Sequence, residues 1–275
     1  MPNTISNIVR EALLAGYYHA SRPLRWWAAR HRSRQGNCPV TVLFYHRIAD
    51  NCPNDWTMST QAFAQQISWL QRNFDLISLS EAQSRLRSGC NPRPAVSITF
   101  DDGYADNCRF ALPMLAQRRI PVTYFVTTHH ILHGDPFPHD VARGEPLTPN
   151  TVEQLRKLAG DGVEIGAHTR SHADLGQIQN PDILYDEVVA AGEQLQAAVG
   201  QTIRYFAFPF GQINNLNSDV FHLAYDAGYE GVCSAYGGYN FPDDDVFHLQ
   251  RFHADPSSLR LINWLTVDPR WLNSP

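Results

Sequence analysis

Short apolar runs alternate with longer amphipathic stretches along the chain from residue 39 onward. The short runs are rich in β-branched and aromatic residues, which predicts buried strands at 40–45, 95–100, 121–126, 163–166, 204–208 and 231–234. The longer stretches place apolar residues on one face, which predicts helices at 59–74, 105–118, 151–159, 182–199 and 218–227. This alternation is typical of a mostly parallel sheet with crossover helices.

The repetition of strand and helix favours a barrel of the (β/α) kind, in which the loops that follow the strands carry the chemistry. The chain has 275 residues, and a domain usually holds roughly 100–200 residues. We predict two segments, an N-terminal basic amphipathic helical arm, residues 1–36, and one folded domain, residues 37–275.

The arm differs from the rest of the chain in charge. Six arginines against one glutamate give it a net charge of +5, and because the whole chain carries −5, the remainder holds −10. Apolar residues recur at helical spacing up to Tyr17, and Ser21-Arg22-Pro23 interrupts that pattern. Arginines beside the pair Trp26 and Trp27 are typical of a helix that makes peripheral contact with an anionic membrane. The alternative is a helix packed on the domain, with its arginines solvated.

Net charge, cysteine spacing and the length of the apolar runs each argue against one class of protein. A net charge of −5 argues against nucleic-acid binding by bulk electrostatics. The five cysteines are never spaced as CxxC, so we expect free thiols rather than a disulfide framework or a cysteine zinc site. No apolar run approaches the ~18 residues that span a bilayer, and no secretory signal is visible. We therefore expect a cytoplasmic protein, at the inner membrane face if the arm binds lipid.

Polar clusters follow two of the predicted strands. Asp101 and Asp102 come directly after the strand at 95–100, and adjacent carboxylates are costly to bury unless they are paired or bind a metal. Neighbouring side chains at a strand end point different ways, so one can ligate a metal while the other faces the substrate. An Asp-Asp-Gly surface turn is the alternative. His168 and His172, four residues apart, follow the strand at 163–166 and suit one metal ion, although an isolated HxxxH match is weak.

Two histidines and one carboxylate leave coordination positions open, which is typical of a catalytic rather than a structural zinc site. Zn²⁺ held by Asp102, His168 and His172 would polarise a carbonyl and lower the pKa of a coordinated water to around 7. Co²⁺, Ni²⁺ or Fe²⁺ could use the same ligands. Asp101, free of the metal, could take the proton of that water. A third cluster, 204–211, holds Arg204, which could bind a carboxylate bidentately.

Together the three clusters resemble the motifs of the polysaccharide deacetylase family, also called the NodB-homology domain or carbohydrate esterase family 4. Those motifs are Thr-Phe-Asp-Asp-Gly at 99–103, His-Thr-x-x-His at 168–172 and Arg-x-Phe-x-x-Pro-x-Gly at 204–211. The resemblance covers about residues 39–255 and implies a distorted (β/α) barrel and metal-dependent removal of acetyl groups from sugars.

The resemblance also implies roles for individual residues. Asp101 resembles the general base, and Arg204 resembles the residue that holds it. Asp102, His168 and His172 resemble the metal ligands, and the backbone N–H of Phe210 resembles the oxyanion stabiliser. Aromatic residues of these clusters would form sugar-stacking walls or pack in the core, namely Tyr104, Phe208 and Phe210.

The general acid is the point at which the chain departs from the family pattern, because the late Leu-His-Asp segment that carries it in many members is absent. His46 follows the strand at 40–45 within a Tyr-His motif that resembles the branch acting on poly-N-acetylglucosamine. His253 lies close to where the late motif would fall. We favour His46, because imidazole at a strand end suits acid catalysis near neutral pH.

These observations predict a metal-dependent hydrolase that removes N-acetyl groups from a glucosamine-containing saccharide, giving acetate and a free amino sugar. Its partner would be the acetylated saccharide substrate. One alternative is an O-acetyl esterase acting on a polysaccharide such as xylan. Another is a catalytically inactive saccharide-binding module on the same scaffold, which the free base beside an open metal site argues against.

Overall fold

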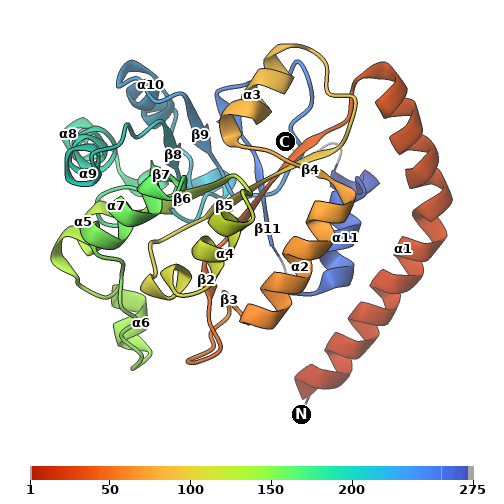
Figure 1. Cartoon of the computed structure of the whole chain (residues 1–275), viewed down its shortest axis with the longest axis horizontal. Helices are drawn as coiled ribbons and strands as arrows, with labels where there is room; N and C mark the ends of the chain where they lie inside the picture. The colour runs from red at the N-terminus through yellow and green to blue at the C-terminus, as the bar shows by residue number, and fades with distance from the viewer. Residues whose placement is uncertain (1, 255, 272–275) are drawn as a thin grey trace.

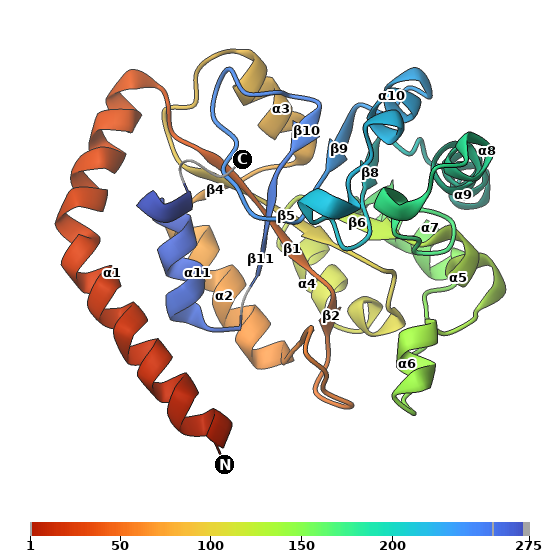
Figure 2. The ribbon, with the colours of Figure 1, turned by 180° about the vertical axis from the view of Figure 1, so that it is seen from behind.

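The computed structural model describes residues 2–254 and 256–271. Residue 1 of the predicted arm and residues 255 and 272–275 of the predicted domain lie outside the described residues. A parallel sheet curls through the centre of the molecule with helices packed around it (Figures 1 and 2). Its main path runs in the order β10-β9-β8-β7-β6-β5-β1-β11, and β4 pairs with β5.

The strands are β1 Val40–Tyr45, β2 Arg47–Ile48, β3 Thr57–Met58, β4 Asp75–Leu76, β5 Ala95–Phe100, β6 Val122–Val126, β7 Glu164–Ala167, β8 Tyr205–Ala207, β9 Gly231–Cys233, β10 His248–Leu249 and β11 Arg251–His253. The α-helices are α1 Pro2–Gln35, α2 Thr60–Asn73, α3 Leu79–Arg87, α4 Ala111–Gln117, α5 Thr128–His133, α6 Pro138–Ala142, α7 Val152–Gly160, α8 Pro181–Tyr185, α9 Ala191–Val199, α10 Ser218–Asp226 and α11 Ser258–Leu265. Among the described residues, no helix is long and apolar enough to cross a membrane.

The two edges of the sheet meet because β10 and β11 are consecutive in the chain. β10 pairs with β9 at one edge and β11 pairs with β1 at the other, and only Gln250 separates them. Asn240 holds this junction: its side chain accepts from the Gln250 N–H at 2.8 Å and donates to the Gln250 carbonyl at 3.0 Å. The result is the nearly closed (β/α) barrel that the sequence predicts.

The central strands have the composition of strands buried on both faces. Every residue of β1, β5 and β6 is buried, because helices cover the sheet from outside and side chains fill it from inside. Local signals fix the helix starts. Thr151 forms a capping box with Gln154 at the start of α7.

Three predicted helices differ in detail from the structure. The stretch at 105–118 is a 3₁₀ turn, Ala105–Cys108, followed by α4, and the stretch at 182–199 contains a π-helical segment, Asp186–Ala190, between α8 and α9. The third is α1, which continues through Pro23 although the pattern is interrupted there. Arg25, two residues later, donates to the carbonyl oxygen of Asn263 at 2.8 Å and so ties the second half of α1 to α11.

The sequence pattern did not predict several short elements. Helix α3, strand β11 and the short helices α5 and α6 of the histidine-rich stretch after β6 were missed. The predicted free thiols are confirmed: all five cysteines are unpaired.

Candidate active site

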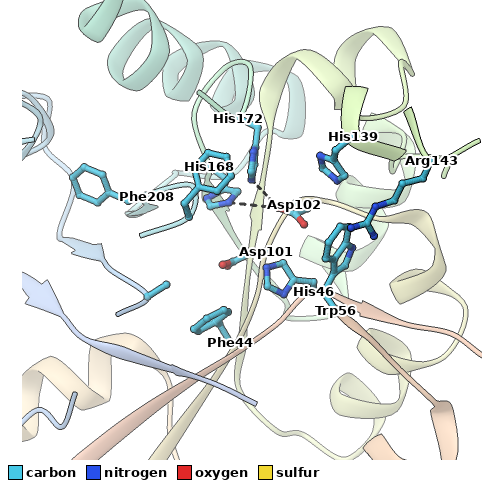
Figure 3. A pocket seen from close by; sticks show the side chains of 12 residues that line it. Phe44, His46, Trp56, Asp101, Asp102, His139, Arg143, His168, His172 and Phe208 are labelled. Carbon is cyan, nitrogen blue, oxygen red and sulfur yellow. Dashed lines mark ion pairs between the residues drawn. The ribbon is translucent and has the colours of Figure 1, made fainter. Parts of the chain in front are cut away.

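Loops after neighbouring strands meet over one open end of the barrel. The register places Tyr45 beside Phe100, Phe100 beside Tyr124 and Val126 beside Ala167, so the segments that follow β1, β5, β6 and β7 begin at the same edge of the sheet. They enclose a cavity of about 460 Å³ (Figure 3). Its lining residues are Phe44, His46, Trp56, Asp101, Asp102, His139, Arg143, His168, His172, Phe208, Phe210 and Ala235.

Asp102, His168 and His172 point toward one another at the base of this cavity (Figure 3). The Oδ1 atom of Asp102 lies 3.2 Å from Nε2 of His172 and 3.6 Å from Nε2 of His168. One ligand atom from each of the three residues lies within 4.8 Å of the others. The predicted ligand set is therefore assembled from two loops that are far apart in the sequence.

The hydrogen bonding of these side chains fits a cation between them. Nδ1 of His168 lies 2.7 Å from the carbonyl oxygen of Ala207, which can only accept, so Nδ1 carries the proton. The Nε2 lone pair of a neutral His168 then faces the buried Oδ1 of Asp102, which has no hydrogen-bond partner. An ionised carboxylate facing imidazole lone pairs is a donor set suited to Zn²⁺ and similar divalent ions.

The backbone around this ligand set adopts conformations that non-glycine residues rarely take. Asp102 has φ 75°, Thr169 has φ 62°, His172 has φ 62° and Phe210 has φ 60°. Such left-handed residues cost of order 1–3 kcal/mol each and persist where the surroundings enforce them, commonly at functional sites. The surrounding protein therefore fixes the conformation of these loops before any ligand binds.

Glu187 holds the loop that carries the two histidines. Its carboxylate accepts hydrogen bonds from the N–H of Arg170 at 2.9 Å, the N–H of Ser171 at 3.0 Å and the hydroxyl of Ser171 at 2.6 Å. Glu187 lies in the π-helical segment and is buried, and π-bulges are frequent at functional sites. Sequence reasoning missed this residue, because nothing local links it to a loop 16 residues earlier.

Asp101 does not join the ligand set but forms a buried ion pair with Arg251 of β11. The guanidinium donates to Oδ1 at 2.7 Å and to Oδ2 at 2.9 Å, and both side chains are almost fully buried. Burial raises the pKa of Asp101, but the charge of Arg251 and its hydrogen bonds outweigh this effect and lower the pKa below its usual value. Asp101 is therefore ionised at neutral pH and held in one orientation.

The expectation that Arg204 holds Asp101 is wrong. Arg204 precedes β8 and pairs instead with Glu164 and Glu230. Parallel strands gather their amino ends at one side of the sheet and their carboxyl ends at the other, so Arg204 and Asp101 lie on opposite sides. Arg251 reaches Asp101 because β11 pairs with β1, which lies beside β5.

Of the two histidines predicted as acid candidates, His46 lines the cavity and His253 does not. Their ring centroids are 5.7 Å apart, with His253 in a small neighbouring pocket that His46 also lines. Asn107 fixes the chain at His46 by donating to its carbonyl oxygen at 2.6 Å. The buried Nδ1 of His46 has no hydrogen-bond partner among the described residues.

The aromatic residues near the site divide between core and cavity. Tyr104 is fully buried in a cluster with Phe137 and Leu147, so the core-packing alternative holds for it. Phe208 is buried but lines the cavity, and Phe210 is 55% exposed at its edge. Among the described residues, the backbone N–H of Phe210 has no hydrogen-bond partner. Trp56, which sequence reasoning missed, forms part of the opposite wall.

A family model for polysaccharide deacetylases matches residues 88–232, more than half of the chain. The chain belongs to the polysaccharide deacetylase family. The resemblance seen in the sequence motifs is thereby confirmed, and deacetylases of this family hydrolyse acetyl groups from saccharides.

Two bacterial proteins illustrate the relationship of this deacetylase to known sequences. YxkH of Bacillus subtilis, named for the same family, is 25% identical over 219 residues, which cover 79% of this chain and 72% of YxkH. The poly-β-1,6-N-acetyl-D-glucosamine N-deacetylase of Staphylococcus aureus is 28% identical over 194 residues. That match covers 67% of this chain and 64% of the staphylococcal enzyme, less than two thirds of its length.

Solved structures show the same fold. IcaB from Ammonifex degensii superimposes with a TM-score of 0.69 at 23% identity, over 84% of this chain and 98% of that one. Streptococcus pyogenes deacetylase PplD, solved in complex with acetate, gives a TM-score of 0.67 at 21% identity, over 82% of this chain and 97% of that one. The deacetylase barrel therefore accounts for most of the molecule.

Proposed function

We propose that this deacetylase is a metal-dependent enzyme that removes N-acetyl groups from a glucosamine-containing poly- or oligosaccharide. The observation that carries the proposal is the convergence of Asp102, His168 and His172 within 4.8 Å, with an ionised Asp101 beside them that is not part of the set. A saccharide-binding module has no need for a free base next to an open metal site. The similarity to a poly-β-1,6-N-acetyl-D-glucosamine N-deacetylase supports the choice of sugar.

A divalent ion held by these three residues would supply a Lewis acid for the acetyl carbonyl and lower the pKa of the attacking water. Zn²⁺ is the default, and Co²⁺, Ni²⁺ or Fe²⁺ would suit the same atoms. Ala207 orients His168 through its carbonyl, and Glu187 orients the loop of His172. Such supporting hydrogen bonds fix the direction of metal ligands.

Asp101 is the proposed general base. A carboxylate offers about four lone-pair sites, and the two bonds from Arg251 leave others free to face the cavity. Asp101 takes a proton from water, whose oxygen attacks the acetyl carbon. The N–H of Phe210 then donates to the oxygen that becomes negatively charged, which is worth a few kcal/mol in comparable sites.

His46 is the proposed general acid, because it shares the cavity with Asp101 and Asp102. Breaking the C–N bond requires that the leaving nitrogen gain a proton, which His46 donates, so that acetate and an amine result. An ester releases an oxygen leaving group that depends much less on such a proton. How far activity depends on His46 therefore discriminates an N-deacetylase from an O-acetyl esterase. His253 is the second candidate for the general acid.

Acetate release should be measured on an N-acetylglucosamine oligomer and on an aryl acetate. Asp101→Asn should keep the bound metal and lose activity on both substrates, whereas His168→Ala should lose metal and activity together. His46→Ala should lose at least 10²-fold on the amide and much less on the ester. Near-normal turnover by Asp101→Asn would refute the base assignment, and equal losses by His46→Ala on both substrates would refute the acid.

A further inference from the structure

Helix α1 packs on the barrel through only one of its faces. Tyr17 donates to Asp268 at 2.8 Å, and Arg25, which is buried, donates to the backbone and the side chain of Asn263 at 2.8 Å and 2.7 Å. Glu11 pairs with Arg260 of α11 at 3.3 Å. These contacts hold α1 along the outer edge of the molecule, with its other side facing away from the body in both views (Figures 1 and 2).

The face of α1 that points away from the body is apolar. Val9, Leu13, Leu24 and Trp27 are 52%, 71%, 59% and 60% exposed. Their spacing places them within about 60° of one another around the helix, in a row down one side. We call this row the outer stripe. Together with Trp26, α1 carries five of the eleven large hydrophobic side chains exposed in the described structure, a concentration that marks an interaction surface.

The flanks of the outer stripe are basic. Arg10, Arg30 and Arg34 are exposed and lie on either side of the stripe around the helix. The only acidic residue of the helix, Glu11, is engaged by Arg260. The helix is therefore a positive strip on a molecule whose remainder carries −10, and at 1.5 Å per residue its 34 residues extend about 50 Å.

We propose that the outer stripe of α1 binds the surface of an anionic lipid bilayer. The apolar side chains of the stripe, Trp27 among them, would enter the interface while the flanking arginines meet anionic headgroups. A second copy of the chain is a poorer occupant, because pairing two outer stripes would bring two rows of arginines together. A bilayer is long and flat enough to cover the whole helix, and it repels the acidic body while attracting α1.

This attachment would leave the cavity accessible. The N-terminal end of α1 points to the same side of the molecule as the carboxyl end of β1, from which His46 follows (Figures 1 and 2). The outer stripe itself contributes no residue to the cavity. Substitutions there should therefore change membrane binding without changing hydrolysis of a soluble substrate.

The test is co-sedimentation of the full chain with vesicles of phosphatidylcholine alone or mixed with phosphatidylglycerol. One variant combines Leu13→Gln, Leu24→Gln and Trp27→Gln, and a matched control combines Ile183→Gln, Tyr185→Gln and Tyr225→Gln, which are 48%, 48% and 69% exposed elsewhere. A third combines Arg10→Gln, Arg30→Gln and Arg34→Gln. Point substitutions are preferable to deletion of α1, because deletion would also remove the contacts of Arg25.

We expect the wild type and the matched control to bind vesicles that contain phosphatidylglycerol, and binding to weaken as salt is raised. The arginine variant should bind on the order of a hundredfold more weakly, and the stripe variant should remain in the supernatant with unchanged acetate release. Binding of the stripe variant at wild-type strength would overturn the proposal. So would a wild type that ignores both vesicles, or one that dimerises through the stripe in sedimentation without binding lipid.

Discussion

Replacing Arg251 tests whether it, and not Arg204, is the partner of the proposed base. Arg251→Gln removes two hydrogen bonds to Asp101, at 2.7 and 2.9 Å, and further bonds to Thr99 and to the carbonyl oxygen of Ser234. Asp101 would be left buried and unpaired, and breaking a buried ion pair in this way costs about 3–5 kcal/mol. That is a large part of the 5–15 kcal/mol that usually stabilises a domain.

Arg204→Gln is the matched control. The Arg204 side chain is 37% exposed and pairs with Glu164 and Glu230 at the other side of the sheet, so its loss should cost about 1 kcal/mol or less. Urea unfolding followed by tryptophan fluorescence measures both variants, and acetate release measures their activity. We expect Arg251→Gln to lose stability and activity, and Arg204→Gln to keep most of both.

A double variant separates the lost pair from general damage. Asp101→Asn removes the charge that Arg251→Gln leaves unpaired, so the double variant should be more stable than Arg251→Gln alone. Arg251→Lys, which keeps the charge but not the two-pronged geometry, should fall between wild type and Arg251→Gln. The reasoning is refuted if Arg251→Gln unfolds within about 1 kcal/mol of wild type, or if Arg204→Gln loses activity to the same extent.

Two further predictions concern the supports of the site and of α1. Glu187→Ala should weaken Zn²⁺ binding about 10–100-fold, because it frees the loop of His172. Glu187→Gln should bind Zn²⁺ nearly as tightly as wild type does. Equal Zn²⁺ affinities of Glu187→Ala and wild type in a chelator competition would contradict this role. Burial raises the pKa of Asp268, but hydrogen bonds from Arg270 and Tyr17 outweigh it and lower the pKa below its usual value. Stability from Asp268 is therefore present above about pH 4 and lost as pH falls through the lowered value. Asp268→Asn should lower the melting temperature at pH 7, and the gap to wild type should narrow in acid; a constant gap would rule this out.

The parts of the site that lie next to strands in the sequence could be predicted. Asp101, Asp102, His168 and His172 each follow an apolar strand, and parallel strands bring such positions together. The proposed ligand set is therefore visible in local patterns, and the structure brings ligand atoms of Asp102, His168 and His172 within 4.8 Å of one another. The fold class followed from the same alternation of strands and helices.

The supports of the site could not be predicted, because they depend on long-range pairing. Arg251 reaches Asp101 only once β11 has paired with β1, and a lone arginine in a short segment gives no sign of that register. Glu187 acts through a π-helical segment that reads in sequence as ordinary helix. The prediction for Arg204 was wrong although its motif marks a strand of the site. Arg204 stands at the amino end of that strand, whereas the cavity lies at the carboxyl ends.

The left-handed backbone positions at the site have a consequence for the evolution and engineering of this chain. Asp102, Thr169, His172 and Phe210 would each relax if replaced by glycine, which adopts positive φ freely. Selection for thermal resistance alone would therefore favour glycine at these positions, which include the proposed metal ligands Asp102 and His172 and the proposed oxyanion donor Phe210. The non-glycine side chains at these positions indicate that the chain has lost some folding stability in exchange for a site whose shape is set before substrate binds.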